Sequence, residues 1–502
     1  MDRRDMLVGL GGLYGATGGM LAANADPLEP PDLVDNSACV RATEKNIEHY
    51  CPGTTLLNCC PPYQGTNVQV KEYEFPKTTM RVRRPAHLVA SDQEYMEKYK
   101  TAIKKMKEEL PDDDPRNFYQ QAKIHCAYCN DAYYLHFYER ILGSLIGDDS
   151  FALPYWNFDI KDGMKMPPIF LDKKSPLYND KRDMDHDQIV VDFKYGYNDG
   201  ERGVEGDDDD LVKKNQEYLR KTFKEGLPLP ELFMGDRVRA GEEATAGTTM
   251  GQMEGIHNAF HQWVGTKQSP HTDMGSFATS GRDCMFYCLH ANVDRMWDLY
   301  QEQRKLRKYG PEFNDDDDWL NSTFVFYDEN KQVVKVQTPW LDPVPKKKTK
   351  IKSKGSIVQV KEFGSAPRAL DGAIQVLLTR PKKSRSKAEK EGQSEVLIIN
   401  GIEVADGKEA RFDVYVDAPV GSDRAGPDKG DFVGSFVKLP ETVKAVKAKE
   451  MKGLPKLGIT GALEENEIED AEKVVVTLVP RFGEVTIGGL SIQLIQNDVK
   501  SL

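Results

Sequence analysis

The pattern of apolar and polar residues predicts helices in the first part of the chain. Ser91 to Glu109 is predicted to be a helix, because a Ser-x-x-Glu capping box opens it and Leu110-Pro111 ends it. Further helices are predicted in three places: Tyr133 to Gly143, the segment around His257 and His261, and Ala291 to Gln303. Residues 26–115 otherwise have a turn-rich, irregular sequence.

From residue 318 onward the pattern changes to short alternating strands. Ser322 to Tyr327 and Gln332 to Gln337 flank the turn Asp328 to Lys331 and predict a hairpin. Further strands are predicted at Ile357–Val360, Val396–Ile399, Arg411–Val416, Phe432–Val437, Val474–Leu478 and Ser491–Leu494. This spacing is typical of a β-sandwich-like domain. We therefore expect a mainly α domain with much irregular loop, followed by a β-rich C-terminal domain.

Two Lys/Ser-rich segments, Lys346 to Lys354 and Arg380 to Gly392, interrupt the strands. They are expected to be solvated linkers and strand edges, and a polybasic membrane patch is the alternative.

Three histidines have the spacing of a metal site. His257 and His261 are four residues apart, so a helix projects both imidazoles from one face. His290 lies 29 residues after His261 and is expected to open the next helix. Imidazole binds copper, zinc, iron and nickel, so the spacing alone leaves the metal open. The alternative is a set of ordinary surface or core histidines.

Length and charge limit the class of protein. The 502 residues are enough for two or three domains, and the net charge of −12 argues against a nucleic-acid partner. The chain has no apolar stretch of 18 residues, so no transmembrane segment is expected. The acidic runs Asp207–Asp210 and Asp315–Asp318 are expected to be solvated loops instead of calcium sites.

The N-terminus has the pattern of an export signal. Arg3-Arg4 precedes an apolar, Gly-rich run from Leu7 to Ala23, and an Ala-x-Ala pattern ends at Ala25. We expect the twin-arginine export machinery to recognise it. An ordinary N-terminal helix is the alternative.

Eight cysteines fit an oxidising destination. Four of them cluster behind the signal, at Cys39, Cys51, Cys59 and Cys60. The other four could be packing residues, ligands or cross-link partners: Cys126, Cys129, Cys284 and Cys288.

The sequence resembles the plant polyphenol oxidases over nearly its whole length. Ile124-His-Cys-Ala-Tyr-Cys129 and Phe151-Ala-Leu-Pro-Tyr-Trp-Asn157 resemble their first copper half. Phe286 to Trp297 resembles the second copper motif of tyrosinases, catechol oxidases and haemocyanins. The signal resembles a thylakoid transfer peptide, and Asp318-Trp-Leu320 resembles the segment that follows the catalytic domain in this family.

The resemblance implies an activity and a location. It implies a helical bundle that holds two coppers, each through three histidines, and oxidises o-diphenols (catechols) with dioxygen to o-quinones and water. It assigns His257, His261 and His290 to the second copper, and Phe277 to shielding that copper from substrate. Asn258 and Gln262 should lie near the phenol entrance. The partners are a small phenolic substrate and dioxygen, and the location is the chloroplast thylakoid lumen.

The first copper site departs from the family. His125 matches its first ligand, but Cys129 is followed almost directly by Tyr133, so the second and third ligands are absent. His136 matches neither lost ligand and is expected to be a packing histidine. The alternative is therefore an inactive paralogue, or a truncated gene model, that retains only the second copper site.

The second site keeps its three histidines but departs from the family around them, above all at Glu254. Glu254 lies three residues before His257, whereas the family glutamate that positions a water lies four residues before. One residue of displacement rotates a helical side chain by about 100°. A zinc hydrolase is a further alternative, although Asn258 stands where a metalloprotease helix carries its general-base glutamate.

The resemblance also divides the chain and pairs its cysteines. Residues 1–25 are the signal, 26–315 the copper domain, 316–390 a connecting segment, and 391–502 a domain that keeps the enzyme latent. Disulfides are implied between Cys39 and Cys60 and between Cys59 and Cys126.

Overall fold

The computed structural model describes much of the chain outside the N-terminus. The described residues are 70–74, 81–127, 135–196, 208–235, 251–268, 271–276, 279–309, 323–337, 366–405, 408–417, 431–439 and 455–497. Several expectations lie outside them: the signal, the strand at 357–360, the Lys-rich segment 346–354, Asp318-Trp-Leu320, and Cys39, Cys51, Cys59, Cys60 and Cys129. Within the described ranges, no helix is both long and apolar enough to span a membrane.

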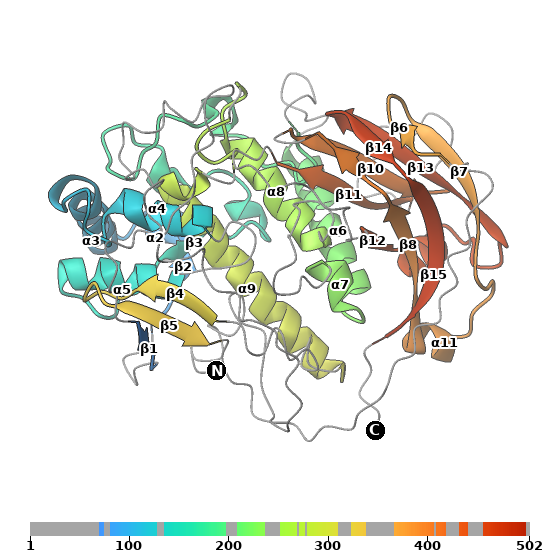
Figure 1. The fold of residues 1–502 in the computed structure, drawn as a ribbon, viewed down its shortest axis with the longest axis horizontal. Helices are drawn as coiled ribbons and strands as arrows, with labels where there is room; N and C mark the ends of the chain where they lie inside the picture. The colour runs from blue at the N-terminus through green and yellow to red at the C-terminus, as the bar shows by residue number, and fades with distance from the viewer. Residues whose placement is uncertain are drawn as a thin grey trace.

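A helical part is followed by a β-rich part, as predicted (Figure 1). The helices are α2 (Ala86–Val89), α3 (Gln93–Lys104), α4 (Phe118–Ala127), α5 (Leu135–Ile146), α6 (Asp208–Gly226), α7 (Pro230–Phe233), α8 (Gln252–Val264) and α9 (Cys284–Leu306). Short 3-10 turns lie at Lys161–Gly163, Pro168–Phe170, Met184–His186 and Ser280–Arg282. In Figure 1, α8 and α9 lie between the α3 and α5 side of the molecule and the sheets.

Helix α3 confirms the predicted helix with one change at its start. Asp92, not Ser91, is the N-cap, and its carboxylate accepts a hydrogen bond from the Tyr95 backbone N–H. A π-helical turn, Lys105–Glu109, continues α3 to the predicted end. The buried face of α3 packs into the core of the helical part through Met96, Tyr99, Ala102 and Ile103.

Helix α9 starts earlier than predicted. Asp283 caps it by accepting a hydrogen bond from the Met285 N–H at 2.8 Å, so the helix begins at Cys284. Arg182 holds the Asp283 carboxylate through two bonds of 2.7 and 2.6 Å, and both side chains are fully buried. His290 therefore lies inside α9 and does not open it. Cys284 and Cys288 are buried free cysteines, which makes them packing residues of this helix.

The β-rich part consists of antiparallel sheets around one apolar core. The strands are β6 (Arg368–Ala369), β7 (Ile374–Thr379), β8 (Gln393–Asn400), β9 (Glu403–Val404), β10 (Ala410–Val416), β11 (Phe432–Lys438), β12 (Lys456–Gly458), β13 (Lys473–Phe482), β14 (Val485–Ile487) and β15 (Gly489–Gln496). They form sheets with the orders β11-β10-β13-β7, β12-β8-β15 and β6-β14-β9. The strands predicted at 396–399, 411–416, 432–437, 474–478 and 491–494 are confirmed.

Residues 381–384 and 386–388 are exposed, as expected of a solvated segment, but the stretch 380–392 is not a linker. Strand β7 pairs with β13, and Arg380 directly behind it is buried against the Glu395 carboxylate at 2.8 Å. The Lys/Ser-rich stretch contains a short helix, α11 (Lys387–Gly392), which Ser386 opens with a capping box. The β-rich part therefore starts inside the segment that we expected to connect the two domains.

The predicted hairpin is confirmed. Strands β4 (Thr323–Tyr327) and β5 (Val333–Gln337) are antiparallel, and β1 (Lys71–Glu72) pairs with β5. The hairpin docks on α5, where the Phe326 and Phe137 rings stack at 5.0 Å and Arg140 donates to Glu329 at 2.8 Å.

Lys194 joins the helical part to the sheets. Its ammonium group lies 3.0 Å from the buried Asp413 carboxylate, 3.1 Å from the Tyr415 hydroxyl and 4.8 Å from the centre of the Phe432 ring. Gly434 of β11 (φ +152°) lies against the first turn of α8, where a Cβ atom would be 2.1 Å from Gln252 Oε1.

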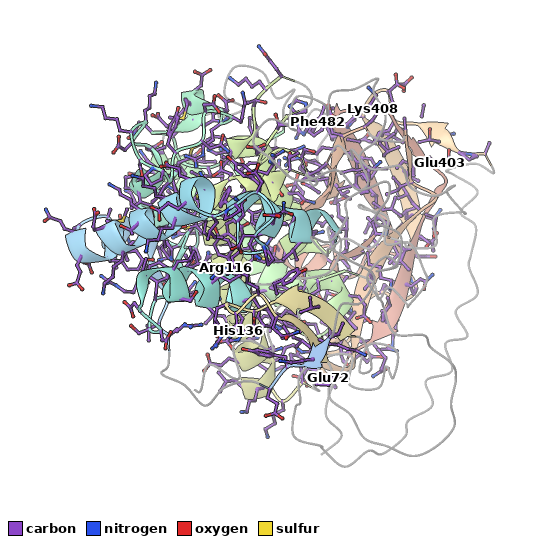
Figure 2. The ribbon with its side chains drawn as sticks, turned by 60° about the vertical axis from the view of Figure 1, so that its left-hand side comes forward. Glu72, Arg116, His136, Glu403, Lys408 and Phe482 are labelled. Carbon is purple, nitrogen blue, oxygen red and sulfur yellow. The ribbon has the colours of Figure 1, made fainter. Side chains whose placement is uncertain are left out.

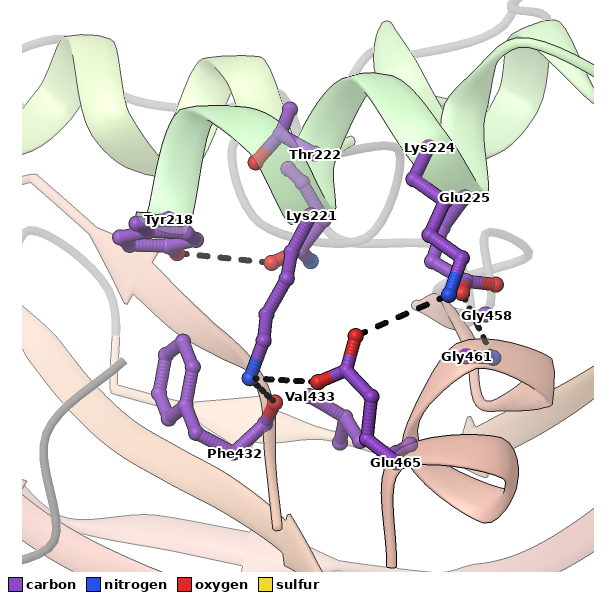
Figure 3. Close-up of a pocket in the computed structure, with 12 residues that line it drawn as sticks. Tyr218, Lys221, Thr222, Lys224, Glu225, Phe432, Val433, Gly458, Gly461 and Glu465 are labelled. Atoms are coloured by element: carbon purple, nitrogen blue, oxygen red, sulfur yellow. Dashed lines mark hydrogen bonds and ion pairs between the residues drawn. The ribbon is translucent and has the colours of Figure 1, made fainter. Parts of the chain in front are cut away.

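A row of ion pairs connects α6 to α12 (Thr460–Glu465), beside a small pocket (Figure 3). Lys224 and Lys221 lie 3.6 and 3.7 Å from Glu465. The Glu225 carboxylate accepts the Gly461 N–H at 2.8 Å, and its burial raises its pKa to about 7. Ion pairs and hydrogen bonds between α6 and α12 therefore attach the β-rich part to the helical part.

Arg83 links two helices through buried carboxylates. Its guanidinium donates to Glu139 on α5 at 2.7 Å and to Asp294 on α9 at 2.5 Å. Glu139 also accepts the Leu153 N–H at 3.0 Å.

Replacing Arg83 should destabilise the fold strongly. Arg83→Met leaves two buried carboxylates without their cation, which costs about 3–5 kcal/mol when one partner of a buried pair is removed. The neighbouring Arg84 pairs with Asp92 at a site where the side chains are 45% and 33% exposed, so Arg84→Met should cost less than about 1 kcal/mol. Urea unfolding of both variants measures the difference, and equal losses would contradict the role given to Arg83.

Candidate metal centre

Three imidazoles meet at one buried point. His257 and His261 come from α8, and His290 comes from α9. His257 Nε2 lies 2.9 Å from His261 Nε2 and 3.1 Å from His290 Nε2, and all three rings are buried. Among the residues that the structure describes, this is the one group of three or more metal-ligating side chains close enough to share an ion. The three histidines grouped by the spacing argument therefore lie together in the structure.

The far nitrogens of the two α8 histidines are held in place. His261 Nδ1–H donates to the Met274 carbonyl at 2.7 Å, and His257 Nδ1–H donates to Glu254 Oε2 at 3.2 Å. A proton on Nδ1 leaves the lone pair on Nε2, which faces the centre of the cluster. Both rings therefore present a metal-binding nitrogen to the same point.

The electrostatics of the cluster favour neutral ligands. Burial, followed by the charge of His257, lowers the pKa of His261 and of His290 well below the usual value. Burial alone would raise the pKa of Glu254, but the charge of His257 and hydrogen bonds from His257 and Asn258 outweigh it and lower this pKa. Histidine must be neutral to bind a metal, so the lowered pKa values suit His261 and His290 as metal ligands.

His125 lies next to this cluster. It belongs to α4, and its ring centre is 6.1 Å from that of His290. The Phe286 ring contacts both, with centre distances of 4.5 Å to His125 and 4.1 Å to His290. His125 Nδ1 is 3.3 Å from Ser280 Oγ.

His136 lies elsewhere, as a packing histidine (Figure 2). Its Nε2 accepts the Tyr73 hydroxyl at 2.8 Å, and its ring packs edge-on against Phe137. Burial lowers the pKa of His136 to about 3. The histidine in the 3-10 turn after Asp183 is also used in packing, since the His186 ring stacks on Trp263 at 3.9 Å.

The residues fit one metal of the copper pair that the resemblance implies. The three-histidine cluster has three buried Nε2 donors close enough to share one ion. At the first site, the structure places His125 alone, and residues 128–134 are outside the described chain. The described residues therefore do not assemble a second three-histidine set.

The other predicted site residues have mixed outcomes. Phe277 lies outside the described residues, as does the side chain of Cys126. Asn258 and Gln262 are buried, at 2% and 0% exposure, because β11 and the neighbouring helices cover α8. Every residue of α8 except Glu254 is buried.

Sequence reasoning missed two supports of the cluster. The Met274 carbonyl orients His261, and a backbone group leaves no signal in the residue type. Phe286 contacts both His125 and His290, and the sequence indicated it only as part of the resemblance.

Three sequence families match the chain. The common central domain of tyrosinase matches residues 133–303, the polyphenol oxidase middle domain 313–339, and the chloroplastic polyphenol oxidase C-terminal domain 366–494. Chloroplastic polyphenol oxidase from Vitis vinifera is 40% identical over 99% of this chain and 88% of its own length. Chloroplastic catechol oxidase B from Solanum tuberosum is 38% identical over 98% of this chain and 89% of its own.

Solved structures agree with these matches. Latent aurone synthase, a polyphenol oxidase, is 34% identical and has a TM-score of 0.78 over 94% of this chain and 99% of its own. Latent apple tyrosinase is 36% identical and has a TM-score of 0.70 over 85% of this chain and 100% of its own.

His136→Gln should change acid stability and leave metal binding unchanged. The folded pKa of His136 is about 3 and the unfolded value is about 6.5, so the contribution of the neutral ring is present above pH ~6.5 and is lost as pH falls. Between pH 7 and pH 5 the unmodified chain should lose about 2 kcal/mol of unfolding free energy through His136, and the variant should not show this loss. Urea unfolding at pH 7 and pH 5 measures the change, and copper titration measures affinity. If the difference in unfolding free energy between the variant and the unmodified chain were the same at pH 7 and pH 5, the prediction would be wrong.

Proposed function

The chain belongs to the polyphenol oxidase family of plants, and on that premise we propose that it oxidises o-diphenols with dioxygen to o-quinones and water, using copper. Oxidation of one catechol releases two electrons, and reduction of dioxygen to water takes four. Two catechols are therefore consumed for each dioxygen. The family chemistry is copper-dependent phenol oxidation, and the preference for o-diphenols belongs to the proposal.

One observation carries the proposal: the three converging Nε2 atoms of His257, His261 and His290. In the proposal these atoms hold one copper, which supplies reversible one-electron transfer when bound. Burial favours the neutral imidazoles of His261 and His290, since it lowers their pKa values. Water is excluded from the rear of the site, since α8 is covered along its length.

Substrate is expected to approach along the side of Glu254, the one residue of α8 that is not buried. Asn258 forms a hydrogen bond with the Glu254 carboxylate and is expected to shape the same side of the site. Phe277 is proposed to shield the copper, and His125 is proposed to bind the second copper. The disulfides of Cys39 with Cys60 and of Cys59 with Cys126 remain part of the proposal.

A second candidate function follows from the ligand count. Between Cys129 and Tyr133 the chain has no histidine, and His136 is bonded to Tyr73. The first copper site therefore lacks two of its three expected ligands. This favours a chain that holds a single copper at His257, His261 and His290 and does not oxidise catechols. A truncated gene model would produce the same sequence.

The relatives are named chloroplastic, which supports a plastid location. We place the mature protein in the thylakoid lumen, delivered by the twin-arginine machinery through residues 1–25. The β-rich part is proposed to hold the enzyme latent until it is removed.

Copper content and oxygen uptake separate the two candidate functions. For catechol oxidation we expect two coppers per chain and oxygen consumption on catechol after proteolytic activation. His290→Gln should lose the copper of the three-histidine site, because two nitrogens of the cluster remain. His87→Gln on α2 is the matched control and should keep it. One copper per chain without oxygen uptake would support the second candidate.

A further inference from the structure

Glu254 has a different contact from the one that the resemblance implies. A glutamate four residues before the first histidine would position a water, but Glu254 is three residues before His257. Its Oε2 lies 3.2 Å from His257 Nδ1, the nitrogen that faces away from the cluster. The carboxylate therefore accepts a hydrogen bond from His257, one of the three histidines proposed to bind copper.

Three features place the carboxylate there. Residues three apart on a helix are neighbours on its surface, which brings the side chains of positions 254 and 257 together. Glu254 lies in the first turn of α8, where the helix dipole stabilises a negative charge. Asn258, one turn further, also bonds to the carboxylate. The Glu254 side chain is still 35% exposed, so it lies at the edge of the cluster.

The two histidines of α8 consequently have unlike acceptors. His261 donates to a neutral carbonyl at 2.7 Å, whereas His257 donates to a carboxylate. A carboxylate acceptor fixes the ring, strengthens the metal-binding nitrogen and brings a negative charge near the ion. That charge stabilises a divalent ion more than a monovalent one, because Coulomb energy scales with charge.

We propose that Glu254 is a positioning residue: it holds His257 through Nδ1 and biases the site toward Cu(II) over Cu(I). The proposal rests on copper binding at the three-histidine site, and it holds whether or not the chain turns over catechols.

Glu254→Gln tests this on the full-length chain. Loss of such a support weakens metal binding by about 10–100-fold, which we expect for Cu(II). Removal of one charge changes the logarithm of the Cu(I) affinity about half as much, so a loss of about 3–10-fold is expected for Cu(I). The copper reduction potential therefore rises. Competition titrations with chelators measure both affinities, with the Cu(I) titration done anaerobically.

Glu231→Gln is the matched control, since Glu231 lies part-buried in the first turn of α7. It should leave both affinities unchanged. Thermal unfolding of the metal-free variants monitors folding, because a folding defect would lower the affinities for Cu(I) and Cu(II) by equal factors.

The proposal would be overturned if Glu254→Gln lowered the Cu(I) and Cu(II) affinities by equal factors, or if it left the Cu(II) affinity unchanged. Failure of the unmodified chain to bind copper would overturn it together with the proposed function. The expected shift between Cu(II) and Cu(I), found in a chain that takes up no oxygen with catechol, would support the role of Glu254 and overturn catechol oxidation alone.

Discussion

Three imidazoles packed within about one hydrogen-bond length of each other must lose the water between their rings, and the surrounding protein must supply partners for their outer nitrogens. Nε2 distances of 2.9 and 3.1 Å leave no space for solvent between the rings. The far nitrogens of His257 and His261 then need acceptors from within the protein, which Glu254 and the Met274 carbonyl provide. The cluster therefore depends on α8, α9 and the loop behind α8 holding one arrangement.

Buried ion pairs hold these elements in that arrangement. Arg182 fixes Asp283, which caps α9 about two turns before His290. Arg83 joins Asp294 on the same helix to Glu139 on α5. Buried pairs of this kind specify an arrangement more than they add stability, because desolvation offsets much of their attraction. Helix α9 is thus positioned at its start and at its middle by charges that come from distant parts of the sequence.

The local patterns predicted the local features well. The four-residue spacing of His257 and His261 brought two ligands to one helix face, and alternation predicted the hairpin and five strands. The start of α9 was missed because Cys284 to Leu289 is nearly all apolar, and such a run has no periodicity that distinguishes helix from strand. Arg380 was assigned to a linker on composition, whereas a partner 15 residues away buries it. For Glu254, helix geometry fixed the rotation of the side chain but not the donor whose hydrogen bond the flexible carboxylate accepts.

Lys194, from the helical part, forms an ion pair with Asp413 of the β-rich part. Asp413 also has cations of its own sheet, since Arg411 lies 3.5 Å and Arg481 2.8 Å from its carboxylate. If the two parts came apart, Asp413 would keep these partners and Lys194 would be hydrated. Neither Asp413 nor Lys194 would then be a buried charge without a counterion, so this ion pair does not by itself oppose opening of the junction.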